Sequence, residues 1–556
     1  MSLSGLPDDL AAEDPEAVLA IDASPRGAKL TSRRELRRRA GALRAGLDRA
    51  GVRAGDCVAV WLPNWSDTLA WQFAAAALGA HVVGVNTRYN VDEAVHVLER
   101  ARPKIVAIAH EFHELDLLGR LRKAVVIADA PVPVVVPVPG PQHDGQAEAR
   151  PYDLGGGAWT MADLTGSGDA GPGDASPGDA SPGDARPGDT DPGTINRDGA
   201  DLAVAFTTSG STGKPKLAAH RETAVEGHAR DDARAIGLGP GDVALCALPL
   251  SGTFGFSTAM AAIAGGGACL LEPAFDPVAA LDDMAAHGVT HVIGGDDMIS
   301  RLADAWAGHQ VGLPALRWFG AADFIGRMPD VVAWARRFGA VTSGVYGSSE
   351  VFALILLWPG DEPEPRRWLG GGRVVGPETE IRTADPVTGA VLPAGEQGEL
   401  QFRGPTVADA YLGDADAMAR NVTGDGWFRS GDLAVIGADG AAEFACRMGD
   451  VLRLRGFLVA PAEIEARLAA HETVDVAKVV GVREATGATR AVAFVVAAAG
   501  ARADPETLRE WCAAGLAAFK VPAEVRVIAE MPTTSGTNGS KIRAATLREW
   551  AAATAR

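Results

Sequence analysis

Residues 207–216, TTSGSTGKPK, combine hydroxyl side chains, glycines and two lysines in one short stretch. Hydroxyls and backbone N–H groups of such a loop can donate hydrogen bonds to phosphate oxygens, and lysine adds a compact positive charge. The Walker A loop is a poor match, because Gly210 and Gly213 lie too close together and a proline follows the Gly-Lys pair. The stretch therefore predicts a phosphate-binding loop of another class, with a plain surface loop as the alternative.

The elements around this loop are expected to place it at the edge of a sheet. The loop directly follows the apolar run DLAVAF, and α/β sheets bind ligands at the carboxyl ends of their strands. Short apolar runs alternate with helical patterns through the first half of the chain, and Ser32 is a candidate N-cap for an early helix. This alternation predicts an α/β fold with parallel sheets and helices on both faces. The runs lie at 57–62, 81–86, 104–109, 202–210, 242–250, 267–273 and 290–295.

Four further segments differ from this pattern in composition. Residues 370–446 have short strand patterns and turn signals, which predict a β-rich subdomain, and a mixed α+β tail follows. We therefore expect an N-terminal domain at 1–448 and a small C-terminal domain at 449–556. Residues 165–197 are rich in Gly, Pro and Asp, which cannot build a core, so they are expected to form a disordered surface insertion. The prolines just before it, at 130–141, oppose a helix or a central strand there.

Composition excludes several classes of protein. The net charge is −19, from 52 basic and 71 acidic residues, whereas nucleic-acid binders usually carry a basic surface. The five cysteines include no C-x-x-C pair, which argues against zinc and suits the reduced thiols of a cytoplasmic protein. The acidic N-terminus does not resemble a signal peptide. The longest apolar stretch is broken by glycines and is shorter than the ~20 residues of a membrane-spanning helix.

Further motifs follow the loop in a recognisable order. They are VYGSSE at 345–350, WFRSGDL at 427–433, RMGDVLRLRGFLVAPAEIE at 447–465 and NGSKIRAATLRE at 538–549. Together with the phosphate loop they resemble the motifs of the adenylate-forming enzymes, which include acyl-CoA synthetases, luciferases and nonribosomal adenylation domains. The resemblance covers nearly the whole chain except the insertion. It implies a large adenylation domain followed by a small mobile domain.

The resemblance also implies a role for individual residues. Lys541 is expected to be catalytic, because its charge would offset the repulsion between an attacking carboxylate and the α-phosphate of ATP. Glu350 is expected to bind Mg²⁺ through oxygen. Tyr346 should lie against adenine, with a packed core tyrosine as the alternative, and Lys216 either assists the phosphate loop or is a solvated charge. The expected nucleotide- and coenzyme A-binding residues are Thr208, Ser209, Ser211, Thr212, Lys214, Gly320, Ala321, Tyr346, Gly347, Ser349, Asp432, Arg447 and Gly456.

The sequence departs from the family pattern at three places. The hinge position is Gly449, where Asp or Lys is usual, and Arg455 stands where enzymes that use coenzyme A mostly carry a small residue. The segment SGTFGFS replaces the usual histidine or bulky aromatic of the acid pocket. Phe254 and Phe256 within it either line the acyl site or pack in the core.

The favoured function is an ATP-dependent acid–CoA ligase that forms an acyl adenylate and pyrophosphate, then an acyl-CoA thioester, in fatty or aromatic acid metabolism. One alternative passes the activated acid, which includes unusual small oxyanions, to an amine or a carrier-protein thiol. A second alternative is a non-catalytic nucleotide-binding protein. The expected ligands are ATP, Mg²⁺, coenzyme A and a small acid, and the chain is expected to be a monomer or homodimer.

Overall fold

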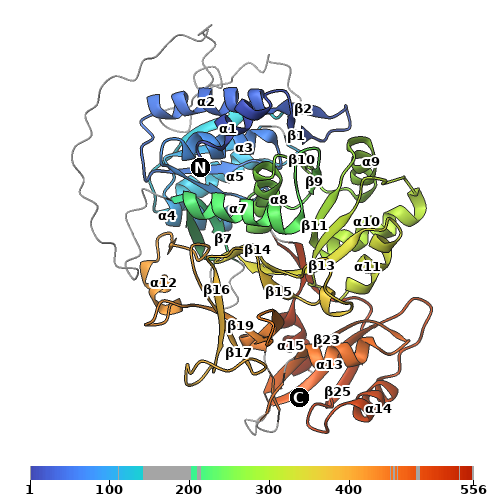
Figure 1. Cartoon of the computed structure of the whole chain (residues 1–556). Helices are drawn as coiled ribbons and strands as arrows, with labels where there is room; N and C mark the ends of the chain where they lie inside the picture. Colours follow the sequence, from blue (N-terminus) through green and yellow to red (C-terminus); the bar gives the residue numbers. More distant parts are fainter. Residues whose placement is uncertain are drawn as a thin grey trace.

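A computed structural model describes two large sheets with helices between and outside them, followed by a small C-terminal unit (Figure 1). The predicted insertion at 165–197 lies outside the described residues. The described residues are 2–110, 112–141, 202–208, 215–450, 452–454, 457–459, 461–483, 489–536 and 539–553.

The first sheet has seven strands and carries the start of the phosphate loop. The five strands from β7 (Leu202–Thr207) to the far edge, β6 (Val134–Val138), run parallel, as the strand–helix alternation predicts. Strands β8 (Leu217–Arg221) and β18 (Ala410–Tyr411) are antiparallel to their neighbours. The proline-rich run forms the edge strand β6, where Pro137 is tolerated because an edge strand has one unpaired side. In order across the sheet the strands are β18 (Ala410–Tyr411), β8 (Leu217–Arg221), β7 (Leu202–Thr207), β4 (His81–Gly84), β3 (Cys57–Trp61), β5 (Ile105–Ala109) and β6 (Val134–Val138).

The second sheet has thirteen strands and joins a parallel half to an antiparallel half. The parallel half contains β1 (Val18–Asp22), β10 (Ala268–Leu271), β9 (Val243–Cys246), β11 (His291–Gly295), β12 (Trp318–Ala322) and β13 (Val341–Ser348), with β2 (Lys29–Ser32) as its antiparallel edge. The antiparallel half is the β-rich part of the chain. It contains β14 (Phe352–Leu357), β15 (Gly371–Val374), β20 (Ala442–Arg447), β19 (Phe428–Ile436), β17 (Gln397–Arg403) and β16 (Glu380–Ala384).

Helices lie between the two sheets and outside them (Figure 1). Helices α3 and α7 contact strands of both sheets, so they belong to the layer between them, and α8 packs beside α7. Helix α2 begins at the predicted cap, since the Ser32 side chain accepts a hydrogen bond from the Glu35 N–H. The helices of this part are α1 (Leu6–Glu13), α2 (Arg33–Arg49), α3 (Ser66–Ala76), α4 (Val91–Ala101), α5 (Leu117–Ile127), α7 (Glu222–Ile236), α8 (Thr253–Ala264), α9 (Pro277–His287), α10 (Asp296–His309), α11 (Met328–Arg336) and α12 (Ala415–Asn421), with the 3-10 turns η1 (Arg366–Trp368) and η2 (Met448–Asp450).

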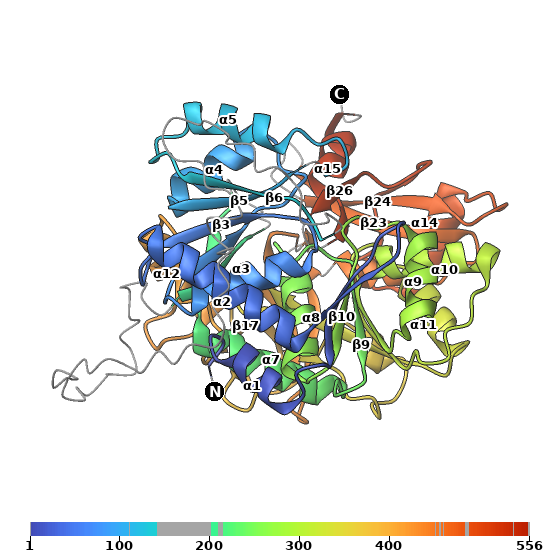
Figure 2. The same cartoon turned by 90° about the horizontal axis from the view of Figure 1, so that it is seen from above.

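The C-terminal unit has its own apolar clusters, centred on Ile464 and Val492. Its hairpin β26–β27 places β27 against α10 and β11 of the large domain. Figures 1 and 2 show the C-terminal unit on the same side of the molecule as α10 and α11. The elements of this unit are the pair β21 (Leu452–Leu454) and β22 (Phe457–Val459), the sheet β23 (Val474–Arg483), β24 (Thr489–Ala497) and β25 (Glu524–Val527), the hairpin β26 (Thr533–Gly536) and β27 (Gly539–Ile542), and the helices α13 (Pro461–Ala469), α14 (Pro505–Gly515) and α15 (Ala544–Ala553).

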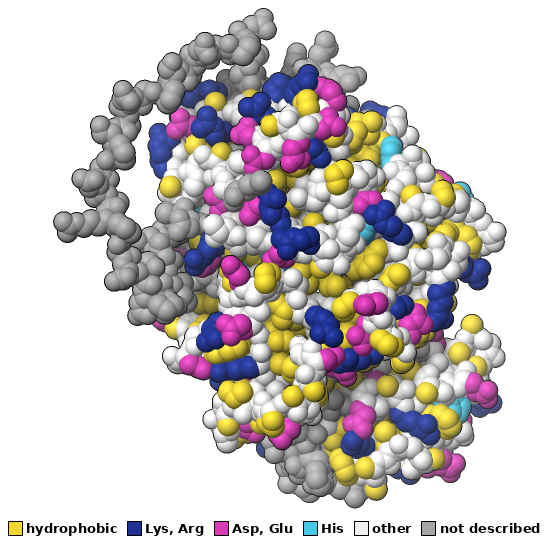
Figure 3. All heavy atoms as spheres, in the orientation of Figure 1, with side chains coloured by type: hydrophobic (Ala, Val, Ile, Leu, Met, Phe, Trp, Pro, Cys, Tyr) yellow, Lys and Arg dark blue, Asp and Glu magenta, His cyan; other side chains and the backbone are white. Residues whose placement is uncertain are grey.

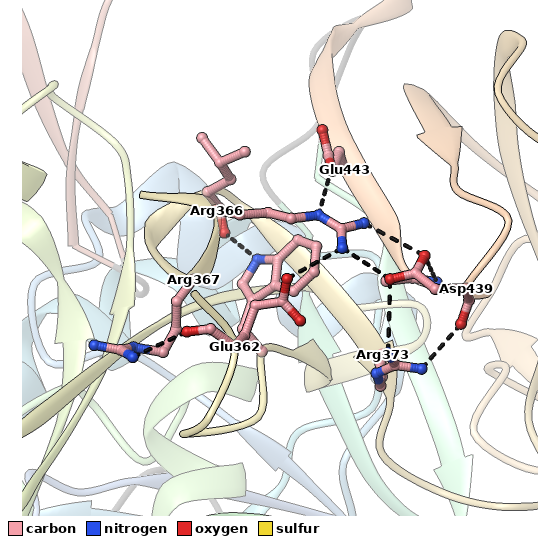
Figure 4. Close-up of polar contacts among 9 residues, drawn as sticks. Glu362, Arg366, Arg367, Arg373, Asp439 and Glu443 are labelled. Atoms are coloured by element: carbon pink, nitrogen blue, oxygen red, sulfur yellow. Dashed lines mark hydrogen bonds and ion pairs between the residues drawn. The ribbon is translucent and has the colours of Figure 1, made fainter. Parts of the chain in front are cut away.

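The surface is mixed in charge. On the face drawn in Figure 3, Lys and Arg side chains are interspersed with Asp and Glu side chains. One polar network, centred on Arg366, ties η1 to the turn between β19 and β20 (Figure 4). Within the described part of the chain, each helix is too short or too polar to span a bilayer.

Candidate active site

The antiparallel strands β19 and β20 place Asp432 directly opposite Arg447. Asp432 is only 2% exposed, and its Oδ1 lies 2.9 Å from the Arg447 Nε. The Tyr346 hydroxyl donates a hydrogen bond of 2.5 Å to the other carboxyl oxygen, Oδ2. Burial and the nearby Asp432 charge raise the pKa of Tyr346 well above its usual value, so the phenol stays protonated and remains a donor. The two residues predicted to bind ribose thus meet the residue predicted to contact adenine.

The Tyr346 ring lies among aromatic side chains. It stacks on Phe402 with centroids 6.0 Å apart and planes 7° apart, and Phe444 lies 5.6 Å away on a tilted plane. The next residue, Gly347, allows a close backbone approach, since a Cβ there would lie 2.5 Å from the Ala353 Cα. This packing is also what a core tyrosine would show, so an adenine contact for Tyr346 and Gly347 stays a prediction.

Glu350 lies in the turn between β13 and β14. Its carboxyl oxygen Oε1 accepts a hydrogen bond of 3.0 Å from the Tyr411 hydroxyl, and its backbone oxygen accepts one of 2.7 Å from the Ala408 N–H. The carboxylate is partly exposed and offers hard oxygen donors, so the residue fits the predicted Mg²⁺. Sequence reasoning missed Tyr411, which lies outside the recognised motifs and reaches Glu350 only through the fold.

The phosphate loop is anchored at both of its ends. The Thr208 N–H donates to the Lys216 carbonyl at 2.8 Å, and the Lys216 N–H donates to the Thr208 hydroxyl at 3.2 Å. The Lys216 ammonium lies 4.6 Å from the centre of the Tyr411 ring, so the end of the loop is close to the Glu350 turn. The predicted phosphate ligands between these two anchors lie outside the described residues. They are Ser209, Ser211, Thr212 and Lys214.

Ser349 and the end of β12 lie near the same edge. Ser349 is buried, and its hydroxyl donates to the Thr207 carbonyl at 3.4 Å, which links the Glu350 turn to the last residue of β7. Gly320 and Ala321 are buried in β12, where they pair with Ser343 and Gly344 of β13. The structure therefore brings together residues of four of the recognised motifs: the anchors of the phosphate loop after β7, the Glu350 turn after β13, and the Asp432–Arg447 pair on β19 and β20.

The predicted catalytic lysine is on the hairpin of the C-terminal unit. Lys541 lies on β27, its backbone paired with Thr534, and β27 packs against α10 and β11 of the large domain. Its side chain, together with Arg455 and Gly456, lies outside the described residues. A Cβ at the hinge residue Gly449 would meet no atom within 4 Å, so space alone does not require glycine there.

The unusual segment after β9 is buried. Phe254 and Phe256 are each 5% exposed on α8, and the Phe256 ring packs edge-on against Phe206 at 5.2 Å. Phe256 and Ser251 also line a small internal cavity beside α3. These contacts support core packing for Phe256 and leave both interpretations open for Phe254.

Comparisons with known proteins agree with this arrangement. Residues 8–412 match the family described as AMP-binding enzyme, and residues 463–537 match the AMP-binding enzyme C-terminal domain. A feruloyl-CoA synthase of an Amycolatopsis species is 30% identical over 505 residues, which cover 90% of each chain. The ATP-bound structure of MatB from Rhodopseudomonas palustris matches with a TM-score of 0.77 and 25% identity, covering 99% of each chain. The amide bond synthetase McbA from Marinactinospora thermotolerans matches with a TM-score of 0.78 and 26% identity, again covering 99% of each chain. The chain therefore belongs to the AMP-binding enzymes of the adenylate-forming superfamily.

Proposed function

We propose that the protein is an AMP-forming acid–CoA ligase for a small-to-medium organic acid. The observation that carries this proposal is the cluster of Asp432, Arg447 and Tyr346 beside the Glu350 turn, in a chain of the AMP-binding family. The names of similar proteins support coenzyme A as the acceptor, since the feruloyl-CoA synthase aligns over nine-tenths of the chain.

The proposed reaction has two balanced steps. In the first, a carboxylate oxygen of the acid forms a bond to the α-phosphorus of ATP, and the bond to pyrophosphate breaks. In the second, the sulfur of coenzyme A bonds to the acyl carbon, its proton is released, and AMP leaves. Asp432 would accept hydrogen bonds from the ribose hydroxyls, with Arg447 holding the carboxylate in place.

Charge balance is the main task of the remaining residues. Glu350 would hold Mg²⁺, which supplies positive charge to the phosphate oxygens when it is bound. Lys541 would add an ammonium group as the acid approaches the α-phosphate, where two anions otherwise repel each other. We propose that residues 449–556 form a lid that brings Lys541 to the nucleotide and then rotates about Gly449 for the second step. Glycine suits such a hinge because it tolerates a wide range of φ and ψ.

A second acceptor class has its own support. The amide bond synthetase McbA resembles the chain as closely as MatB does, with a TM-score of 0.78 against 0.77. Arg455 also stands where a small residue is expected beside the coenzyme A passage. An amine acceptor is therefore the second candidate, and the first step is the same for both.

The first test measures ATP–pyrophosphate exchange over a panel of aliphatic and aromatic acids. Acids that support exchange are then incubated with coenzyme A or with amines. A thioester supports the ligase, an amide without a thioester supports the second candidate, and no exchange with any acid supports a nucleotide-binding protein.

Lys541→Ala tests the role of the lysine. We expect exchange to fall by about 10²- to 10³-fold, the typical cost of removing one group that stabilises developing charge. Lys520→Ala is the matched control, because Lys520 lies in the same unit and pairs with Glu463 at the surface. Near-normal exchange by the Lys541 variant would refute its assignment.

A further inference from the structure

We propose that His220 and His228 are positioning residues that hold the Glu350 turn in the shape needed to bind metal and phosphate. The proposal deepens the proposed function and rests on it, since it takes Glu350 to be the magnesium ligand. Neither histidine lies in the motifs used to assign the site. His220 is the fourth residue of β8, and His228 lies on α7.

The two imidazoles bind the backbone on either side of Glu350. The His220 Nε2 lies 2.8 Å from the Ser349 carbonyl oxygen, immediately before the glutamate. The His228 Nε2 lies 2.7 Å from the Ala353 carbonyl oxygen, three residues after it. A carbonyl can only accept, so both nitrogens must carry the hydrogen. The two rings therefore act as donors to both ends of one short segment.

The backbone between these two carbonyls, and at the residue just after them, is in an unfavourable conformation. Phe352 has a φ of +65°, although it is a large residue with a Cβ, and Leu354 has a φ of +66°. Such left-handed geometry is rare for bulky residues and persists only where the surrounding structure enforces it. The Glu350 turn therefore keeps its shape only where contacts from neighbouring elements hold residues 349–354.

The imidazole rings of His220 and His228 also hold this segment by packing against the Phe352 ring. The Phe352 ring centre lies 4.0 Å from that of His220 and 4.9 Å from that of His228, the latter at an interplanar angle of 20°. Phe352 is 1% exposed, so its position is fixed inside the core. The two imidazoles thus hold the segment by two hydrogen bonds and by contacts to the same ring.

Burial makes these hydrogen bonds costly to lose. His220 and His228 are 0% and 3% exposed, so removing either donor leaves a carbonyl unpaired away from water. Burial also lowers the pKa of both rings to about 4, which keeps them neutral at physiological pH. A carboxyl oxygen of Asp232, one helical turn after His228, lies 3.2 Å from the Nε2 atom of His228.

Among the described contacts, the Glu350 carboxylate has one protein donor, the Tyr411 hydroxyl. Because side-chain contacts hold the carboxylate so weakly, its position depends on the backbone of residues 349–354. A shift of Ser349 would also disturb its bond to Thr207 at the start of the phosphate loop. Residues that orient metal ligands in this indirect way commonly change metal affinity or activity by about 10- to 100-fold when they are removed.

The test compares His220→Phe, which keeps an aromatic ring but lacks the donor, with His220→Gln, which keeps an N–H donor. ATP binding is measured by calorimetry at increasing Mg²⁺ concentration, so no acid substrate is needed. We expect His220→Phe to raise the Mg²⁺ concentration for half-maximal ATP binding by about tenfold or more, and His220→Gln to restore most of the loss. His81→Phe is the control for burying a phenylalanine in place of a histidine, since His81 is also buried, 5% exposed against 0%, but lies at the start of β4.

The thermal midpoint of each variant separates positioning from general destabilisation. If His220→Phe and His81→Phe lose stability alike and both keep the wild-type Mg²⁺ requirement, the proposal is wrong. If His220→Phe does not fold, the Mg²⁺ requirement and thermal midpoint of His228→Phe are compared with those of His81→Phe, and an unchanged Mg²⁺ requirement would again show that the proposal is wrong. Wild-type ATP binding that ignores Mg²⁺ would also overturn the proposal. A wild type that binds Mg²⁺ and ATP but activates no acid would refute the proposed function alone.

Discussion

Two clusters in the molecule pair arginine with carboxylates, and they differ chiefly in burial. Around Arg366, the side chains of the three carboxylates Glu362, Asp439 and Glu443 are 12%, 34% and 40% exposed (Figure 4). Around Asp432, the arrangement is reversed, since one carboxyl group with a 2% exposed side chain meets one arginine and one tyrosine. The exposed cluster centres on a cation and the buried one on an anion.

This difference determines what each cluster can do. Water and salt screen the surface charges, so each pair around Arg366 contributes little, and together they tie a turn to its neighbours. A buried carboxylate is costly unless it is fully paired, and its hydrogen bonds are stronger because the surroundings are less polar. From this comparison we propose that the buried cluster serves ligand binding and that the exposed cluster serves stability. Four variants test this division.

Asp432→Asn should have the largest effect, and the effect should be on binding. A hydrogen bond to a charged group is worth about 1.5–3 kcal/mol, so we expect ATP to bind roughly 10- to 100-fold more weakly. Isothermal titration with ATP and Mg²⁺ measures the change. Asp439→Asn is the control from the exposed cluster and should bind ATP as the wild type does. Equal losses in both variants would contradict the division.

Tyr346→Phe should have a smaller effect, divided between binding and stability. The variant keeps the aromatic ring beside Phe402 but removes the donor to the Asp432 Oδ2. We expect the free energy of unfolding to fall by about 1.5–3 kcal/mol, because a buried charged acceptor loses one partner. Urea denaturation measures this, and ATP titration should show a weaker loss than for Asp432→Asn. An unchanged unfolding free energy would mean that the Tyr346 hydroxyl is not a needed partner.

Much of the fold follows from local signals, and these are the parts that the sequence predicts. The Ser32 cap, the alternation of strands and helices, and the exclusion of a helix or a central strand from the proline-rich run all depend on residues close together in the chain. The pairing of β1 with β10 was not predicted, because nothing local indicates which distant strand completes a parallel sheet.

In the candidate active site, too, the sequence predicts the motif residues but not the contacts made by distant elements. Motif order pointed to Asp432 and Arg447, and the structure pairs them across β19 and β20. Tyr411 and His228 were missed because each acts on the Glu350 turn from an element outside the motifs. His228 and Asp232 stand four residues apart on a buried helical face, a spacing that could have marked them as partners.

Arg366→Lys should change stability only. Lysine keeps the charge but not the planar fork that binds Glu443 and Asp439 together. We expect a loss of about 1 kcal/mol at low salt and less in 1 M NaCl, where screening acts within roughly 3 Å. Thermal unfolding at both salt concentrations measures this. Arg34→Lys, at an isolated surface pair with Glu16, should change the midpoint by less, and an equal change would mean that the Arg366 network adds nothing to a single pair.

Asp439→Asn should have the smallest effect, visible mainly in acid. The hydrogen bonds from Arg366 lower the pKa of Asp439 to about 2. A carboxyl group whose pKa is lower in the folded state stabilises the protein above its ordinary pKa near 4, and this contribution disappears as the pH falls from about 4 to about 2. The thermal midpoints of the wild type and the variant should therefore differ at pH 5 and converge toward pH 2. A difference that stays constant over this range would show that the contribution does not come from the charge of Asp439, and Arg366 would then be held by its other contacts, which include Glu443 and the face of the Trp358 ring.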